Sequence, residues 1–149
     1  HKNWQSDHYE QQTGAVAEFL GDTIYTLSSE PNKLIAIDTE EGIDRIIDIL
    51  TPLVGDQVTL VRSQRDFLEI TAPNVSKGRA LAQLALDNNL SLENIVSFGN
   101  AENDISMLSE TGYSVAVSNA TEHVKSVANE VCGHHNEDGV AHWIEKNLL

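Results

Sequence analysis

Two spacings of apolar residues organise the stretch from residue 33 to residue 71. The run from Leu34 to Ile37 predicts a strand, and apolar residues at i, i+3, i+4 and i+7 predict a helix after it that Pro52 ends; these are Ile43, Ile46, Ile47 and Leu50. From Gln57 to Arg62 and from Asp66 to Ile70, apolar and polar residues alternate, with Ser63–Arg65 between them as a turn. This alternation predicts an antiparallel hairpin with one face in water.

The residues before this stretch give weaker signals. A short helix over 15–20 and a strand over 23–27 are the elements that their residue types favour. Together with the hairpin, they indicate that residues 1–71 form an α+β unit.

After Thr71–Asn74 the pattern changes to strands that alternate with helices. Strands are expected at 95–98, at 113–117 and around Val131, and helices after Ser76, from about Asn103, after Thr121 and over 140–148. Ser76 and Thr121 can cap the helices that they precede. Repeated β-α-β units require a parallel sheet with right-handed crossovers, so residues 72–149 predict an α/β fold.

Charge and cysteine content restrict the partners and the compartment. The formal net charge of −14 over 149 residues argues against a nucleic acid or an anionic membrane as partner, because most of the surface repels phosphate. A small phosphate ester remains possible, since a cation and a few lysines set the local field. The single cysteine, Cys132, excludes an internal disulfide and reads as a small side chain in a strand. There is no membrane-length apolar run and no signal-peptide pattern, so we expect a cytoplasmic protein.

The loop Gly99–Asp104 is the strongest candidate site. It follows a buried strand and opens a helix, which is the place where ligands bind at the carboxyl edge of a parallel sheet. Glu102 and Asp104, with the amide oxygens of Asn100 and Asn103, offer the ligands that Mg²⁺ prefers. The alternative is that Gly, Asn and Asp serve only as turn and cap residues.

Four segments in order resemble signatures of the Cof-like phosphatases of the haloacid dehalogenase (HAD) superfamily: Val75–Leu81, Phe98–Leu108, Val115–Ala120 and Glu137–Ala141. The likeness is strong over 66–149 and loose over 33–65. It implies the C-terminal half of a HAD-type Rossmann-like parallel sheet core at residues 72–149, preceded by part of an α+β cap domain at residues 1–71.

The resemblance also implies roles for individual residues. In the family, a carboxylate attacks the phosphoryl group, a second carboxylate acts as general acid and base, and Mg²⁺ bridges phosphate and protein. Lys77 matches the lysine that neutralises charge on the nucleophile and the phosphoryl group; Asn100 and Asp104 match the acidic positions near the metal, with Asn103 in the same loop; Asn119 matches a position that lines the site. Asn100 stands where the family normally has Asp. Without this context, Lys77 would read as a solvated lysine and Asp104 as a helix-start acid.

The family's nucleophile motif, Asp-x-Asp-x-Thr after an apolar strand, does not occur in these 149 residues. The nearest match, at Asp38-Thr39-Glu40, has Glu as its second acid and lacks the threonine, and the family topology makes it part of the cap. Since the chain starts at His1, we expect a piece of a longer protein that is inactive alone. A missing N-terminal core segment, or self-association, would cover the open edge of its sheet.

Two functions fit these observations. One is that the parent protein is a Mg²⁺-dependent phosphatase of small phosphorylated metabolites, of the sugar phosphate type, that works through an aspartyl-phosphate. The other is a non-catalytic relative that uses the fold for ligand binding or assembly. Asn100 favours the second function, and Lys77 with Asp104 favours the first.

Overall fold

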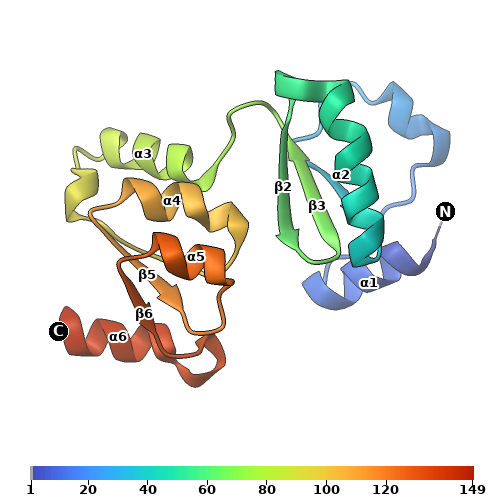
Figure 1. The fold of residues 1–149 in the computed structure, drawn as a ribbon. Coiled ribbons are helices and arrows are strands. Elements are labelled where there is room, and N and C mark those ends of the chain that lie inside the picture. Colours follow the sequence, from blue (N-terminus) through green and yellow to red (C-terminus); the bar gives the residue numbers. More distant parts are fainter. Residues whose placement is uncertain (1) are drawn as a thin grey trace.

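The computed structural model describes residues 2–149, which form two sheets with their own helices (Figure 1). In the N-terminal unit, residues 2–71, strands β1 (Leu34–Ile37), β2 (Thr59–Gln64) and β3 (Phe67–Thr71) pair antiparallel in the order β1-β3-β2. Helix α2 (Glu40–Val54) packs on this sheet through the fully buried Ile43, and α1 (Trp4–Thr13) and a 3-10 helix, η1 (Gly21–Thr26), come before it. The predicted antiparallel sheet is confirmed.

This unit differs from the prediction in three regions. The hairpin turn falls on Arg65 and Asp66 rather than Ser63–Arg65, because an irregularity between Arg62 and Gln64 lengthens β2 and pairs Gln64 with Phe67. Helix α2 continues through Pro52 to Val54, since proline in a last turn costs only one backbone bond before Gly55 ends the helix at φ 46°.

The third difference lies before residue 30. The expected strand over 23–27 is wrong, because Thr23 and Thr26 bond their hydroxyls to backbone carbonyls three residues earlier and support the 3-10 helix η1 instead. The expected helix over 15–20 is also absent from the described residues. Helix α1 forms earlier, between the capping box of Asn3 with Ser6 and the left-handed Gly14.

In the C-terminal unit, residues 72–149, three parallel strands have the order β4-β5-β6. The chain order in this unit is α3 (Lys77–Asp87), β4 (Val96–Gly99), η4 (Glu102–Asp104), α4 (Ile105–Glu110), β5 (Tyr113–Val117), α5 (Glu122–Val127), β6 (Glu130–Cys132) and α6 (Gly139–Asn147). Two short 3-10 helices, η3 (Leu92–Asn94) and η5 (His135–Glu137), lie in its connections, and a third, η2 (Gly55–Gln57), connects α2 with β2 in the N-terminal unit. The parallel β-α-β fold is therefore confirmed. Ser76 and Thr121 cap α3 and α5 as predicted, accepting from the N–H groups of Arg79 and Val124.

The buried core of this unit lies between β5, α4 and α5, around Leu108, Ala116, Val117, Ala120 and Val124. Trp143 of α6 is core, as its helical spacing predicts: it is 8% exposed, meets Phe98 edge-on and donates its indole N–H to Glu130. No helix in residues 2–149 is both long and apolar enough to cross a membrane.

The two units meet where the site is expected. Strand β2 lies against η4, so the hairpin of the N-terminal unit faces the loops that leave β4 and β5. Both loops start at the carboxyl end of a parallel strand. The fold therefore places the candidate loop Gly99–Asp104 at an inter-unit cleft.

Candidate active site

A buried carboxylate and a lysine from two different helices form the centre of the site. Lys77, the first residue of α3, makes an ion pair with Oδ1 of Asp104, although the two residues are 27 positions apart. The Asp104 side chain is 5% exposed, whereas that of Lys77 is 49% exposed. The carboxylate is thus fixed inside the protein, and half of the Lys77 side chain is exposed where it lines the cleft.

Two glycines allow this approach. A Cβ on Gly78 would lie 2.4 Å from the carbonyl oxygen of Ser106, so only glycine lets the start of α3 pack against the start of α4. A Cβ on Gly99 would lie 2.7 Å from the Cβ of Asp104. The glycines next to Lys77 and Asn100 therefore have a packing role that places the ion pair.

The other oxygen of Asp104 organises the loop. Oδ2 accepts hydrogen bonds from the backbone N–H groups of Asn100, at 2.8 Å, and Ala101, at 3.1 Å. Burial alone raises the pKa of the Asp104 carboxyl, but the Lys77 ammonium and these two N–H groups outweigh burial and hold the pKa below its ordinary value. Asp104 is therefore ionised at neutral pH, with three of its roughly four acceptor positions occupied.

The remaining predicted residues lie along the cleft. Asn100 is exposed, and its backbone carbonyl accepts a hydrogen bond from the backbone N–H of Thr121. Asn103 is partly buried and lines the same pocket as Lys77. Asn119 lines the pocket on the β5 side and accepts from the N–H of His135. The structure thus gathers Lys77, Asn100, Asn103 and Asp104 around one loop, with Asn119 at its side.

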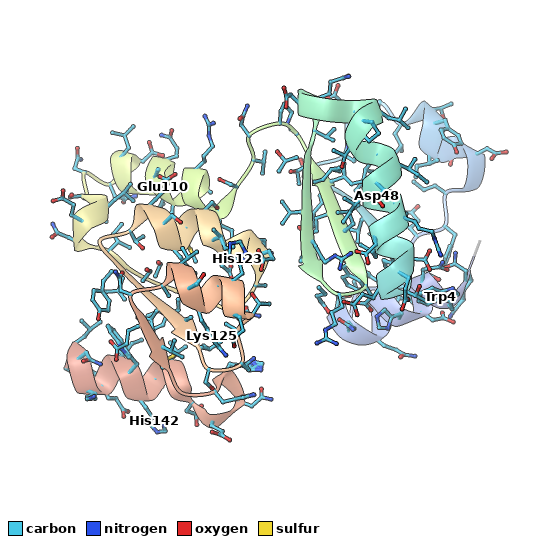
Figure 2. The ribbon with its side chains drawn as sticks, viewed as in Figure 1. Trp4, Asp48, Glu110, His123, Lys125 and His142 are labelled. Atoms are coloured by element: carbon cyan, nitrogen blue, oxygen red, sulfur yellow. The ribbon has the colours of Figure 1, made fainter. Side chains whose placement is uncertain are left out.

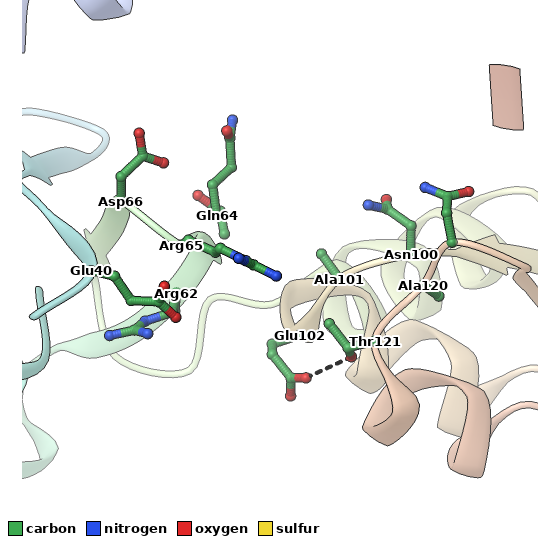
Figure 3. A pocket seen from close by; sticks show the side chains of 12 residues that line it. Glu40, Arg62, Gln64, Arg65, Asp66, Asn100, Ala101, Glu102, Ala120 and Thr121 are labelled. Carbon is green, nitrogen blue, oxygen red and sulfur yellow. Dashed lines mark hydrogen bonds between the residues drawn. The ribbon is translucent and has the colours of Figure 1, made fainter.

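The Glu102 carboxylate binds residues at the start of α5 and not Lys77. Its carboxylate accepts from the Thr121 hydroxyl at 3.0 Å, drawn as the dashed line in Figure 3, and lies 2.8 Å from Nδ1 of His123. His123 belongs to α5 and is labelled in Figure 2. Glu102 therefore ties the loop to α5, and the loop's oxygen atoms do not all converge on one point.

The cleft includes two adjoining pockets of about 710 and 530 Å³, which share Ser63, Gln64, Asn100 and Ala101. The first pocket also has Arg62, Arg65 and Asp66 from the hairpin and Asn119–Thr121 from the loop after β5; the second has Lys33, Glu69, Lys77 and Asn103. In Figure 3 the Arg65 side chain extends from the hairpin toward Ala101 and Asn100. Polar groups from both units thus surround one space, large enough for a small metabolite.

Sequence reasoning missed the hairpin side of the cleft. Arg65 and Asp66 were read as turn and strand residues, and only their position opposite the loop after β4 makes them part of the site. The available signal was the polar run Arg62–Asp66 between two apolar-alternating strands, which a solvent-exposed turn explains equally well.

The described residues offer part of a ligand set for a hard cation. No group of three or more His, Cys, Asp or Glu side chains is placed to hold a metal within residues 2–149. The amide oxygens of Asn100 and Asn103 and the remaining acceptor position of Asp104 are of the chemical type that Mg²⁺ takes. Because Mg²⁺ keeps several waters and needs few protein ligands, this donor set fits the ion but requires a further carboxylate for tight binding.

Fold and cleft define an α/β protein with a charged, ligand-sized space at the carboxyl edge of its parallel sheet. A family model described as haloacid dehalogenase-like hydrolase matches residues 1–144, and the chain belongs to this family, as one of its Cof-like members. The resemblance carried by the four sequence signatures is thereby confirmed.

Individual relatives are similar over most of this chain. It is 33% identical over 140 residues to the chloroplastic endoribonuclease YBEY of Arabidopsis thaliana and 35% identical over 117 residues to the putative phosphatase YxeH of Bacillus subtilis. These matches cover 82% and 78% of this chain but 24% and 43% of the two relatives.

Solved structures give the same picture. The protein TM0651 of Thermotoga maritima superposes with a TM-score of 0.79 at 34% identity, over 100% of this chain and 56% of that one. The sugar phosphatase BT4131 has a TM-score of 0.68 at 26% identity, over 79% of this chain and 44% of that one. The chain therefore spans about half, or less, of the length of the relatives that it matches.

Proposed function

We propose that this chain is the part of a Mg²⁺-dependent phosphatase that closes over and completes the active site for small phosphorylated metabolites. The observation that carries the proposal is the ion pair of Lys77 with buried Asp104 at the edge of a ligand-sized cleft. The Lys77 side chain is half-exposed and lines the cleft, where its ammonium group can meet a phosphoryl group, and Asp104 keeps this group in position. Phosphoryl transfer depends mainly on such positioning and charge stabilisation.

In this proposal, residues 1–71 are part of the cap and residues 72–149 are the C-terminal part of the core. The nucleophile, an aspartate, comes from an N-terminal core segment, because the 149 residues contain no Asp-x-Asp-x-Thr. Strand β4 pairs with β5 alone among the described strands, so its other edge can accept a strand from that segment. Self-association at this edge is the alternative when the segment is absent.

Each residue of the site then has one task. The aspartate attacks phosphorus, the bond to the leaving alkoxide breaks, and water later hydrolyses the aspartyl-phosphate. Lys77 stabilises the negative charge of the equatorial oxygens, and Asn119 contacts the bound molecule. Mg²⁺, held by Asn100 and Asn103 and by Asp104 directly or through a water, would supply further positive charge.

Sugar phosphates are the proposed substrates. The cleft offers uncharged hydrogen-bonding side chains suited to hydroxyl groups, namely Ser63, Gln64 and Asn119. One structural relative is itself named a sugar phosphatase. The cytoplasmic location stays a prediction.

The test is phosphate release from a panel of sugar phosphates and p-nitrophenyl phosphate by the protein containing the N-terminal segment, with Mg²⁺ or with EDTA. Turnover that EDTA abolishes supports the proposal. The same assay on this chain alone should give no release. If the chain alone turns over p-nitrophenyl phosphate and Asp38→Asn abolishes it, the nucleophile lies in the chain and the proposed division of the site is wrong.

A non-catalytic, ligand-binding relative is the second candidate, and Asn100 is the observation that favours it. An amide at this position supplies an oxygen but no negative charge, and a cation beside a phosphate ester is then held more weakly. Asn100→Asp should tighten Mg²⁺ binding in calorimetry and raise activity at low Mg²⁺. Tighter binding without turnover would favour the non-catalytic candidate, and unchanged affinity would remove Asn100 from the metal site.

A further inference from the structure

Four cationic side chains line the cleft, and three of them have a carboxylate partner. Lys77 pairs with Asp104, Lys33 with Glu69, and Arg62 with Asp44. Arg65 makes no ion pair and no side-chain hydrogen bond within residues 2–149. In a chain of formal net charge −14 with many more acids than bases, a cation without a carboxylate partner at the wall of a pocket is available to an anionic ligand.

Two of the three acids of the same pocket have other partners. Asp66 lies 2.6 Å from Nε2 of His8, and Glu102 binds Thr121 and His123. Glu40, the first residue of α2, makes no ion pair and no side-chain hydrogen bond within residues 2–149, and the partial positive charge of the helix N-terminus stabilises its carboxylate. The positive charge of Arg65 is thus not neutralised by these contacts, and its side chain extends toward the loop after β4 (Figure 3).

The turn that carries Arg65 is braced by the N-terminal helix. His8 of α1 contacts Asp66, the other turn residue, and packs edge-on against Phe67 at a ring distance of 5.5 Å. Tyr9 also packs against Phe67. A braced turn loses little backbone entropy when its side chain binds a ligand, which makes it a suitable place for a recognition residue.

We propose that Arg65 is a specificity-determining residue that binds a second anionic group of the substrate, a carboxylate or a second phosphate, distal to the phosphoryl group that reacts. The inference rests on the proposed phosphatase function and adds the substrate class. Lys77 lines one pocket and Arg65 the other, and the pockets share Ser63, Gln64, Asn100 and Ala101. A molecule with its phosphoryl group at Lys77 therefore passes Asn100 and Ala101 and presents its far end to Arg65. The guanidinium group can bind either anion with two parallel hydrogen bonds.

The test compares matched substrates in the protein containing the N-terminal segment. 6-Phosphogluconate and glucose 6-phosphate share a six-carbon chain and a C6 phosphate, but only the first has a carboxylate; fructose 1,6-bisphosphate and fructose 6-phosphate form the matching pair for a second phosphate. Wild type should prefer one doubly anionic member. Arg65→Gln should raise the KM of that member by about ten- to a hundredfold, leaving its kcat and the KM of the singly anionic partner nearly unchanged.

Arg45→Gln is the control, because Arg45 is exposed on α2 and lines neither pocket of the cleft. Both substitutions remove one positive charge, so they change the net charge by the same amount. The substrate pair in which Arg65→Gln raises the KM of the doubly anionic member identifies the bound anion as a carboxylate or a phosphate. An unchanged preference in Arg65→Gln, or an equal effect of Arg45→Gln, overturns the inference.

Binding measurements distinguish a failure of this inference from a failure of the proposed function. The same four compounds are titrated by calorimetry against wild type, Arg65→Gln and Arg45→Gln. If no substrate is turned over but the doubly anionic compound still binds more tightly through Arg65, the phosphatase proposal fails and the recognition role stands. If wild type binds both members of each pair equally, or binds none of the four, the recognition role fails.

Discussion

Lys77 is the residue on which the proposed chemistry depends most directly. Lys77→Met keeps most of the apolar stem and removes the charge at the cleft, so we expect kcat to fall by about a hundredfold or more while the fold survives. Arginine should rescue poorly, since its planar fork is larger than the ammonium group.

Lys125→Met is the matched control, because Lys125 pairs with Glu122 on α5 and lines neither pocket of the cleft. Steady-state kinetics and circular dichroism on the protein with its N-terminal segment check both variants. A normal kcat in Lys77→Met would show that the charge of Lys77 takes no part in catalysis and that this lysine is an ordinary surface residue.

Asp104 should give the protein a specific sensitivity to acid. Its pKa is lowered in the folded state, so its stabilising contribution is complete above the unfolded pKa of about 3.9 and is lost as pH falls through the lower folded value. Asp104→Asn should cost about 1 to 3 kcal/mol in the free energy of unfolding at pH 7, because the Lys77 ammonium group and two backbone N–H groups lose a buried, charged acceptor. The difference between wild type and variant should shrink below about pH 4.

Urea unfolding of both proteins between pH 3 and 7 measures this difference. Glu110→Gln, an exposed acid at the end of α4, serves as the control and should change little. A gap between wild type and Asp104→Asn that stays constant down to pH 3 would show that the carboxylate is not the source of the effect.

At the scale of elements, burial decided what could be predicted. The spacing of Ile43, Ile46 and Ile47 predicted α2, because one face of this helix packs on the sheet. The run around Val115 predicted β5, because both faces of this strand are buried. Helix α1 has no buried residue and is held by its caps, so periodicity did not predict it. The hairpin turn was misplaced by a backbone irregularity that leaves the residue pattern unchanged.

The candidate site divides in the same way. Its loop was predicted from polar residue types that follow a buried strand, and Lys77 was predicted from the resemblance of Val75–Leu81 to a family signature. That Lys77 contacts Asp104, and that Glu102 turns to Thr121 and His123, could not be predicted. These contacts depend on how closely α3 approaches α4 and on the position of α5, which are tertiary properties.

The contact between α3 and α4 can be tested at Gly78. Gly78→Ala places a methyl group against the Ser106 carbonyl and should separate the two helices, at a cost of about 1 to 3 kcal/mol in stability. Because Lys77 is the neighbouring residue, kcat should fall as well. Arg79→Ala, at an exposed position of the same helix, is the control for stability and activity. Unchanged thermal unfolding and unchanged kcat in Gly78→Ala would mean that the helices relax apart without moving Lys77.

For the whole molecule, the open edge of β4 and the strong negative charge have opposite effects. An unpaired strand edge favours association with another copy, whereas a formal charge of −14 makes copies repel one another. Salt shortens the Debye length to about 10 Å at 0.1 M and weakens only the repulsion between exposed charges. We therefore expect this chain alone to self-associate, and to do so more strongly at 0.3 M than at 0.02 M salt.

Sedimentation equilibrium at the two salt concentrations measures this association. Adding the proposed N-terminal core segment as a separate chain should replace the self-associated form by a one-to-one complex, because we expect a strand of that segment to pair with the same edge of β4. Association that weakens as salt rises would point to attraction between charged surfaces instead of strand pairing. A compact monomer at both salt concentrations would show that the edge of β4 is protected without any partner.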